Sequence, residues 1–409
     1  MKSKKSYAFP LLVLLAVGVT AAAVWYGTSR RSGPSSPATQ ATTPTENFQT
    51  APQLSVANHG GMLVNSDGRI WMWGVKNSYA IGAPIQTDLR QATRMEGIDG
   101  VVTASRTEGY ALAVRHDGSV WGIGDNAAGQ MGNAKSGGRG YTTEWVEIEG
   151  LRDVAQVIAT REMSLVLKKD GTVWASGINE WGRLGENYVG PRSMIHVQLP
   201  HLSGIHQIGV SEWHDAFYAL REDGKVLVWG SRYMLGLPFV RGSRSYIDVP
   251  QEIEGVDDVV AFADKRSSTN RLLVKRRDGS VLLWTGNGIE NCAGERQAVL
   301  QIPEFQDAVW IAETHIFIFA VKADGSLWRK TFDHRENEKC EPPEQLLPAG
   351  SAAKIVAAPD FALLMQDGSV WVWGKLDGPS GPLKHGQFLE WAEREAIKGI
   401  TPQPVFNRE

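Results

Sequence analysis

The sequence predicts an all-β fold: a seven-bladed β-propeller of four-stranded antiparallel blades, preceded by one N-terminal transmembrane or signal helix. The main observation is an Asp-Gly pair that recurs at intervals of 43–55 residues. An aliphatic residue follows each Asp by three positions, and a Trp follows it by four or six. A period of this length is typical of propellers and other repeat architectures. The seven pairs are Asp67-Gly68, Asp117-Gly118, Asp170-Gly171, Asp223-Gly224, Asp278-Gly279, Asp324-Gly325 and Asp367-Gly368.

Each Asp-Gly pair is predicted to close a β-hairpin. In the second repeat, residues 110–115 lead into the turn and residues 119–124 leave it. We expect a two-residue type I′ turn, because Asp and Gly tolerate the positive φ that both of its positions need. The strand after the turn carries an aliphatic residue at offset three and Trp or Leu at offset four. Successive side chains of a strand point to opposite faces, so this strand is predicted to be buried on both sides.

Two further strands are predicted in each repeat. An apolar run precedes the hairpin, as at residues 101–105, 154–159 and 205–210. A run that alternates with charge follows it, and in residues 247–255 this run contains Pro250, which suits an exposed edge strand. Four antiparallel strands per repeat describe a propeller blade. The rival interpretation is a β-solenoid, whose repeats are usually shorter.

The N-terminal segment is predicted to cross or enter a membrane. Three lysines precede an apolar run over residues 7–26, and about 20 apolar residues can span a bilayer. Residues 1–27 are therefore expected to be a cytoplasmic stub and a single-pass signal anchor in a bacterial inner membrane, with the propeller in the periplasm. The alternative is a signal peptide cleaved near Ala23, which would leave a secreted protein.

The rest of the chain divides into a linker and the propeller. Residues 28–53 are rich in Ser, Thr and Pro and form a flexible linker. Residues 54–409 form the propeller, in which residues 388–398 have the spacing of a helix inserted before a closing strand near Pro404.

Composition and motifs favour a binding scaffold over an enzyme. The net charge of −3 and the pI near 6.3 argue against a nucleic-acid surface. His201, His206 and His214 lack the spacing of a metal site. The sequence contains no nucleophile-elbow, zinc-protease or phosphate-binding motif. We therefore expect no cofactor, no metal and no catalytic residue.

Candidate partner-binding residues lie in the loops between the first and second strands, which the repeat places on one face. These loops differ in every repeat, and variable loops on a rigid scaffold usually carry binding functions. Trp181, after the third hairpin, is added as an exposed aromatic anchor. The loop residues are His59, Arg106, Glu108, Arg161, Glu162, Glu212, Trp213, His214, Asp215, Lys265, Arg266, Glu313 and His315.

Two cysteines occupy comparable loops of adjacent repeats. Cys292 and Cys340 follow their Asp by 14 and 16 residues. An exported propeller would lie in a compartment that permits oxidation, so a disulfide between them is predicted. Sequence alone does not establish the short Cβ separation that such a bond requires.

The segments after the second and third turns resemble the regulator-of-chromosome-condensation repeat. That repeat has the form Gly-x-Val-(Tyr/Trp)-x-Trp-Gly-x-Asn-x-x-Gly-Gln-Leu-Gly, and residues 118–132 and 171–185 follow it closely. The resemblance covers residues 54–409 and weakens in repeats 5–7, which lose the Asn-x-x-Gly segment. Its Asp-Gly-x-Val-Trp form looks like the bacterial members of the family.

The resemblance implies a platform that presents loops at one propeller face. We therefore expect a monomeric, membrane-anchored extracytoplasmic propeller that binds an unknown protein of the cell envelope. The alternative is a carbohydrate or cell-wall binding module that uses Trp181, Trp213 or Tyr233 as stacking platforms. The third possibility is a propeller enzyme, a hydrolase or lyase with its site over the central channel.

Overall fold

The structure of this chain is a computed structural model that describes residues 53–373 with internal gaps. All described residues fall in the second of two compact units of the chain, Asn47–Glu409. The gaps are 58–59, 75–88, 108, 135–139, 186–187, 212–215, 234, 238–244, 264–270, 291–293, 315–316, 333–341, 358–360 and 368–369.

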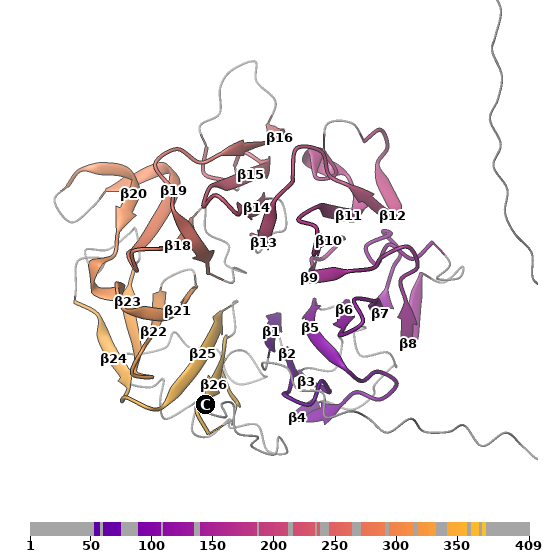
Figure 1. Cartoon of the computed structure of the whole chain (residues 1–409), viewed down its shortest axis with the longest axis horizontal. Helices are drawn as coiled ribbons and strands as arrows, with labels where there is room; N and C mark the ends of the chain where they lie inside the picture. The colour runs from indigo at the N-terminus through magenta and orange to yellow at the C-terminus, as the bar shows by residue number, and fades with distance from the viewer. Residues whose placement is uncertain are drawn as a thin grey trace, which may run out of the picture. The chain divides into compact units, whose positions relative to one another are not determined.

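Six sheets have four strands each, in sequential antiparallel order (Figure 1). Blade 1 contains β1 (Gln53–Ala57), β2 (Gly60–Val64), β3 (Ile70–Gly74) and β4 (Leu89–Arg94). Blade 2 contains β5 (Val101–Arg106), β6 (Tyr110–Arg115), β7 (Val120–Asp125) and β8 (Tyr141–Glu147). Blade 3 contains β9 (Val154–Ala159), β10 (Met163–Lys168), β11 (Val173–Ile178) and β12 (Arg192–Gln198).

The second half of the chain continues this pattern. Blade 4 contains β13 (Ile205–Val210), β14 (Ala216–Arg221), β15 (Val226–Ser231) and β16 (Tyr246–Glu252). Blade 5 contains β17 (Val259–Phe262), β18 (Leu272–Arg276), β19 (Val281–Glu290) and β20 (Arg296–Gln301). Blade 6 contains β21 (Ala308–Glu313), β22 (Phe317–Lys322), β23 (Leu327–Thr331) and β24 (Glu344–Leu347). A further sheet has three strands, β25 (Ala352–Ala357), β26 (Phe361–Met365) and β27 (Val370–Trp373).

The predicted fold class therefore needs correction. The described residues form an all-β propeller of antiparallel blades, but six of their sheets, and not the seven predicted, have four strands. The helical segments of the described residues are single 3-10 turns, η2 (Glu180–Gly182) and η3 (Pro303–Phe305), and none of these residues form an α-helix. The predicted N-terminal helix and the helix at 388–398 lie outside the described residues. No helix in the described part is long and apolar enough to cross a membrane.

The sheets form a closed ring. β1 contacts β5, β5 contacts β9, β9 contacts β13, and β25 returns to β1. On the other side, β14 contacts β17, β18 contacts β21, and β21 contacts β25. The apolar core lies between neighbouring sheets, as where Met62 and Ile70 of blade 1 cluster with Ala111 of blade 2. This sheet-to-sheet core explains the in-phase aliphatic residues of the repeat.

The Asp-Gly turns of blades 1–6 differ from the type I′ turn predicted. In blade 2, Gly118 N donates to Arg115 O (2.8 Å) and Arg115 N donates to Ser119 O (3.0 Å). Gly118 has a φ of +78°, whereas Asp117 is not among the residues with positive φ. The loop is thus a type I turn followed by a left-handed glycine, a G1 bulge. The Asp117 carboxylate accepts the Ser119 N–H (2.9 Å) and stabilises this form, so only Gly needs positive φ.

A polar relay explains the Trp four residues after the Asp. In blade 2, Asp117 Oδ1 accepts the Ser119 hydroxyl (2.6 Å), and Ser119 Oγ accepts Trp121 Nε1–H (3.1 Å). The Arg115 guanidinium lies 5.8 Å from the centre of the Trp121 ring. Blades 3 and 6 repeat this relay at Trp174 and Trp328. Trp121 is half-buried, so it stabilises the turn by these contacts and is not enclosed on both sides as predicted.

The turn glycine also joins neighbouring blades. Val154 N, at the start of β9, donates to Gly118 O (3.3 Å). A Cβ atom on Gly118 would lie 2.9 Å from Asp153 N, so the two backbones approach too closely for a side chain. Gly171 O accepts Ile205 N (3.1 Å) in the same way in blade 3. The Asp-Gly signature therefore specifies the contact between blades as well as the hairpin.

Outer strands of blades 1–4 carry a three-residue bulge. In blade 3, Gly177 pairs with Ser193 and Ala175 pairs with Val197, so three residues of β12 oppose one residue of β11. Blade 2 has the same register shift between its Gly124–Thr142 and Gly122–Val146 pairs. Bulges twist an edge strand and interrupt its hydrogen-bonding edge. The third bulge residue points inward, as for Trp145 in blade 2, which is 7% exposed.

Candidate functional site

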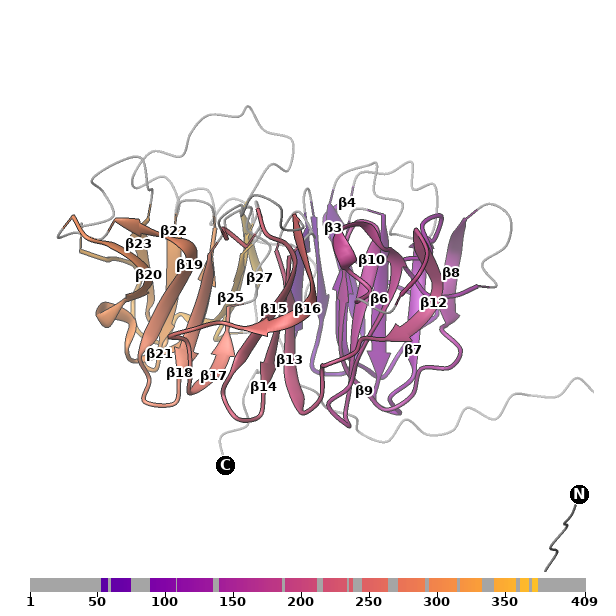
Figure 2. The same cartoon turned by 90° about the horizontal axis from the view of Figure 1, so that it is seen from above.

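The antiparallel order of each sheet separates two faces of the propeller unit. The loops between first and second strands and those between third and fourth strands share one face, here called the loop face. The Asp-Gly turns lie on the opposite face, the turn face, which is the lower one in Figure 2. Among the described residues, the predicted partner-binding positions Arg106, Arg161, Glu162 and Glu313 belong to the loop face.

Arg106 is on the loop-face end of β5 but lies inside the protein. Its side chain is fully buried. Nη1 donates to Gly61 O of blade 1 (3.1 Å) and Nε donates to Thr107 O (3.2 Å). Arg106 N also donates to Ser55 Oγ (3.3 Å). Arg106 was expected on an exposed loop, but it ties blade 2 to blade 1 and offers no surface to a partner.

Glu313 occupies the same position in blade 6 and is also fully buried. Its Oε2 lies 3.8 Å from Arg271 Nε, and Arg271 donates to Phe332 O (2.9 Å) and Thr314 O (3.1 Å). Burial, together with the nearby Glu313 carboxylate, raises the pKa of Tyr218 above its ordinary value. Glu313 is thus buried inside the protein, whereas it was expected on an exposed loop.

Arg161 and Glu162, between β9 and β10, do lie on the surface. Arg161 is exposed, and its side chain makes no hydrogen bond or ion pair with the described residues. Glu162 is half-buried, and its Oε2 lies 3.9 Å from Nη1 of the buried Arg183. Of the predicted residues whose side chains are described, Arg161 is the one free to meet a partner.

The other predicted residues cannot be placed in the same way. Trp181 belongs to the 3-10 turn η2, but its side chain is outside the described part. Tyr233, on the third-to-fourth-strand loop of blade 4, is 79% exposed. The remaining predictions lie outside the described residues: His59, Glu108, Glu212, Trp213, His214, Asp215, Lys265, Arg266, His315, and the proposed disulfide of Cys292 and Cys340.

Comparing equivalent positions of the repeats could have predicted that Arg106 and Glu313 are buried. Their position next to a loop does not predict this. Ala159 and Val210 end β9 and β13 at the positions that Arg106 and Glu313 take in β5 and β21. Ala159 is fully buried and Val210 is 2% exposed. A strand end occupied by apolar residues in two repeats predicts burial in the others, whatever the residue type.

Arg106 and Arg161 can be compared directly by mutation. Arg106→Ala is expected to lower the free energy of unfolding by about 2 kcal/mol, because two buried carbonyls lose a charged donor. Arg161→Ala, at an exposed and unpaired side chain, is expected to change it by less than about 0.5 kcal/mol. Urea denaturation of both variants measures the difference. Equal stability of the two variants would contradict the buried role of Arg106.

Side chains of the first strands join neighbouring blades around the ring. Gln156 Nε2 donates to Ile208 O (3.1 Å) while its Oε1 accepts Ile208 N (3.0 Å). Gln207 binds Phe262 with the same pair of contacts (3.1 and 3.2 Å). Trp310 Nε1 donates to Ile355 O (2.6 Å) at the equivalent position of blade 6. These contacts fix the first strands relative to one another and were not predicted.

A buried histidine links the bulge of blade 3 to the sheet. His196 Nε2 lies 2.9 Å from Ser164 Oγ and 3.2 Å from Ser176 Oγ, and Ser176 donates to Gln130 O (3.2 Å). His196 Nδ1 is buried and has no hydrogen bond among the described residues. Burial lowers the pKa of His196 to about 3. Ser164 is fully buried, so this Ser–His pair is structural and does not face a substrate.

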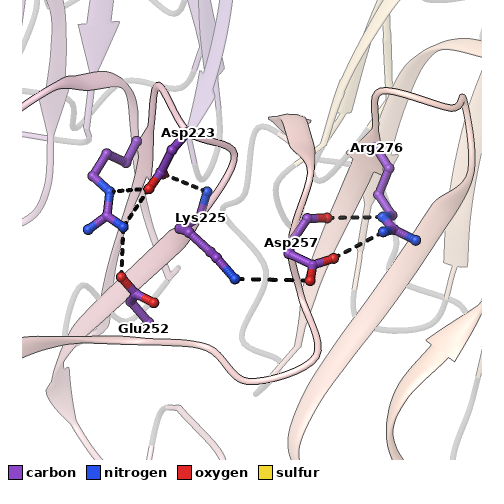
Figure 3. Close-up of polar contacts among 6 residues, drawn as sticks. Asp223, Lys225, Glu252, Asp257 and Arg276 are labelled. Carbon is purple, nitrogen blue, oxygen red and sulfur yellow. Dashed lines mark hydrogen bonds and ion pairs between the residues drawn. The ribbon is translucent and has the colours of Figure 1, made fainter.

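The turn face between blades 4 and 5 carries a network of ion pairs (Figure 3). Arg221 Nη2 lies 2.6 Å from Asp223 Oδ2 and 2.7 Å from Glu252 Oε1. Asp257 lies between Arg276 Nη2 (3.0 Å) and Lys225 Nζ (4.0 Å). The hydrogen bond from Arg221 holds the pKa of Asp223 below its ordinary value. The charges of this network are therefore paired with one another. No group of three His, Cys, Asp or Glu in the described part is arranged to hold a metal ion.

Exposed apolar side chains gather instead at the outer edge of blade 3. Val189, Met194 and Ile195, here called the blade 3 rim patch, are 96%, 36% and 56% exposed. The Ser193 hydroxyl stabilises the bulge that presents Met194 and Ile195 by donating to Ile195 O (2.6 Å). In blade 2 the same two bulge positions hold Thr143 and Glu144. The apolar pair is thus a property of blade 3 and not a requirement of the bulge.

Known proteins with regulator-of-chromosome-condensation repeats are similar to parts of this sequence, which agrees with the resemblance of its repeats. No protein-family model matches the sequence. Human HERC2, an E3 ubiquitin-protein ligase, is 28% identical over 176 residues, which are 41% of this chain and 4% of HERC2. Human protein RCC2 is 25% identical over 135 residues, which are 32% of this chain and 26% of RCC2. The chain therefore matches only a small part of each of these relatives.

Solved structures support the fold. Human WBSCR16 superposes with a TM-score of 0.60 at 18% identity, over 77% of this chain and 86% of that one. Prp20p of Saccharomyces cerevisiae, described with its binding to Gsp1p and histones, gives 0.59 at 17% identity, over 76% and 82%. Yeast RCC1 (Prp20) in the structure of Kap60 bound to it gives 0.60 at 16% identity, over 84% and 82%. This chain thus has the fold of an RCC1-like propeller.

Proposed function

We propose that this chain is a membrane-anchored extracytoplasmic propeller that binds a protein partner through the loop face and rim of blade 3. The observation that carries the proposal is the exposed apolar pair Met194 and Ile195, which lies where blade 2 has Thr143 and Glu144. Exposed apolar side chains held on a rigid framework commonly mark protein interaction sites. Arg161 and Arg192 add exposed positive charge to the same blade.

The relatives support a binding role over a reaction. Prp20p is described with binding to Gsp1p and histones, and yeast RCC1 is bound to Kap60. Those partners belong to those proteins, and the partner of this chain is proposed to be a protein of the cell envelope. The part of the turn face between blades 4 and 5 is a poor candidate, because its charges already form ion pairs with one another.

A photocrosslinking residue placed at Val189 of the full chain tests the interaction in intact cells. We expect a discrete crosslinked protein that mass spectrometry identifies, and we expect Ile195→Glu to reduce its yield at least tenfold. The control places the same crosslinker at Thr143, which takes in the bulge of blade 2 the position that Met194 takes in blade 3. The proposal is wrong if the Val189 probe gives no discrete product, or if the product is equally strong from Thr143 and insensitive to Ile195→Glu.

The location of the propeller is a separate part of the proposal. It is supported by the apolar run at residues 7–26 and by the linker that follows it. In cells whose outer envelope has been opened, added protease is expected to degrade the propeller, while a tag at Met1 stays in the membrane fraction. Protection of the propeller from protease would contradict export, and a tag lost with cleavage near Ala23 would favour the secreted form.

A further inference from the structure

The centre of the ring contains a cavity of about 400 Å³. The first strands of blades 1–4 and β25 line it. Small-molecule pockets commonly measure roughly 300–1,000 Å³. No Asp, Glu, Lys or Arg is among the lining residues, whereas seven polar uncharged or imidazole side chains are: Gln53, Ser55, Thr103, Ser105, Gln156, His206 and Gln207.

Bulges in the first strands shape this cavity. The second residue of β5, β9 and β13 lacks a partner in the register of the neighbouring strand; these residues are Val102, Ala155 and His206. Ala155 and His206 are exposed and Val102 is half-buried. At the second position of its first strand, blade 3 has only the methyl group of Ala155. Space therefore remains between the first strands of blades 2 and 4.

Two polar groups of the cavity wall remain without partners. The Thr103 hydroxyl and the His206 ring make no hydrogen bond or ion pair with any residue in the described ranges. The amides of Gln156 and Gln207 are different, because contacts with the next blade hold each of them in place. Each fixed amide still has one N–H and one acceptor lone pair to offer. The wall thus presents preorganised hydrogen-bonding groups.

The chemistry of the wall restricts the ligand. An ionised ligand would lose its hydration without meeting a carboxylate, ammonium or guanidinium group, which is costly. An apolar ligand would bury the Thr103 and His206 polar atoms without partners, at about 1–3 kcal/mol each. A neutral molecule with several hydroxyl groups avoids both penalties, since a hydroxyl both donates and accepts.

We propose that the central cavity binds a small uncharged polyhydroxylated molecule, of the monosaccharide class, with Thr103 and His206 as direct contacts. The ligand differs from a surface glycan stacked on Tyr233, because the cavity wall contains no aromatic ring other than the imidazole. The proposal is independent of the protein partner, since the rim patch lies on the outer strand of blade 3 and the cavity on the first strands.

Isothermal titration of the purified full-length chain with glucose, N-acetylglucosamine and glycerol tests the proposal. At least one of the three is expected to bind saturably in the millimolar range or tighter. Thr103→Val and His206→Ala are each expected to weaken that binding at least tenfold, while Thr103→Ser retains it. Tyr233→Ala is the surface control and is expected to leave binding unchanged.

Several results would overturn the proposal. No saturable binding by the unmodified chain contradicts it, as does binding unaffected by both cavity variants. Loss of binding in Tyr233→Ala alone would place the ligand on the loop face. Tighter binding of gluconate than of glucose would contradict the preference for an uncharged ligand. Unchanged circular dichroism and thermal midpoints of Thr103→Val and His206→Ala verify that the variants are folded.

Discussion

Replacing Gly177 with Ala is expected to lower the free energy of unfolding by about 4 kcal/mol. Gly177 has a φ of +107°, and a Cβ there would lie within 2.2 Å of Glu162 O and 2.6 Å of Met163 Cα. Both clashes involve the backbone of β10 or the loop before it, so no side-chain rotation relieves them. The unfavourable φ costs about 1–2 kcal/mol and the overpacking adds about 1–3 kcal/mol. Urea denaturation followed by Trp fluorescence measures the loss.

Gly150→Ala separates the two contributions. Gly150 also has a positive φ, +83°, but a Cβ there would meet no atom within 4 Å. This variant is therefore expected to lose only the conformational share, about 1–2 kcal/mol. Similar losses in the two variants would mean that the contact of Gly177 with Glu162 O and Met163 is less tight than the structure shows.

Acid is expected to weaken this propeller through His196 before it protonates the carboxylates. Burial lowers the pKa of His196 from 6.5 to about 3 in the folded protein, so the unfolded state takes up the proton first as pH falls. The contribution of neutral His196 to the free energy of unfolding is complete above pH 6.5, and it is lost progressively between pH 6.5 and about 3. At pH 5 the loss is about 2 kcal/mol, and it approaches about 5 kcal/mol at pH 3.

His196→Gln provides the control for this prediction. Gln places a neutral amide near Ser164 and Ser176, so its stability cannot depend on protonation at this position. Denaturation curves at pH 7, 6 and 5 are expected to converge, with the difference between the original protein and the variant shrinking by about 2 kcal/mol. Carboxylates with lowered pKa values, such as Asp117, contribute mainly below their unfolded pKa near 3.8 and affect both proteins alike. Parallel pH profiles of the two proteins would contradict the role of His196.

The sequence predicted most strands because two independent patterns agree in them. The expected strands at 154–159 and 205–210 match β9 and β13, since alternating apolar residues and a following Asp-Gly turn specify the same hairpin. The turn type was wrong because type I′ and G1-bulge turns share the same Gly requirement and differ in the conformation of the Asp. Asp117 side-chain capping decides between them, and such a contact has no signature in spacing.

Prediction of the site was less successful, for a physical reason. Charge in a loop indicates solvent only if the side chain points outward, and Arg106 points into the gap between blades 1 and 2. Arg161, one blade further, does point outward. The bulge at Met194 and Ile195 was missed altogether, because a register shift of β12 against β11 is invisible in the sequence of either strand. Comparing equivalent positions across repeats recovers the buried charges but not the bulge.

The bulges of the outer strands are positions where the surface of such a protein can evolve without a change in its fold. In blades 2 and 3 the bulge has one buried residue that packs inward, Trp145 or His196, and two exposed residues that point outward. Thr143 with Glu144 and Met194 with Ile195 are therefore interchangeable in the framework while differing completely in what they display. A lineage could acquire or discard a binding partner at one blade by two substitutions, and the ring of blades would fold as before.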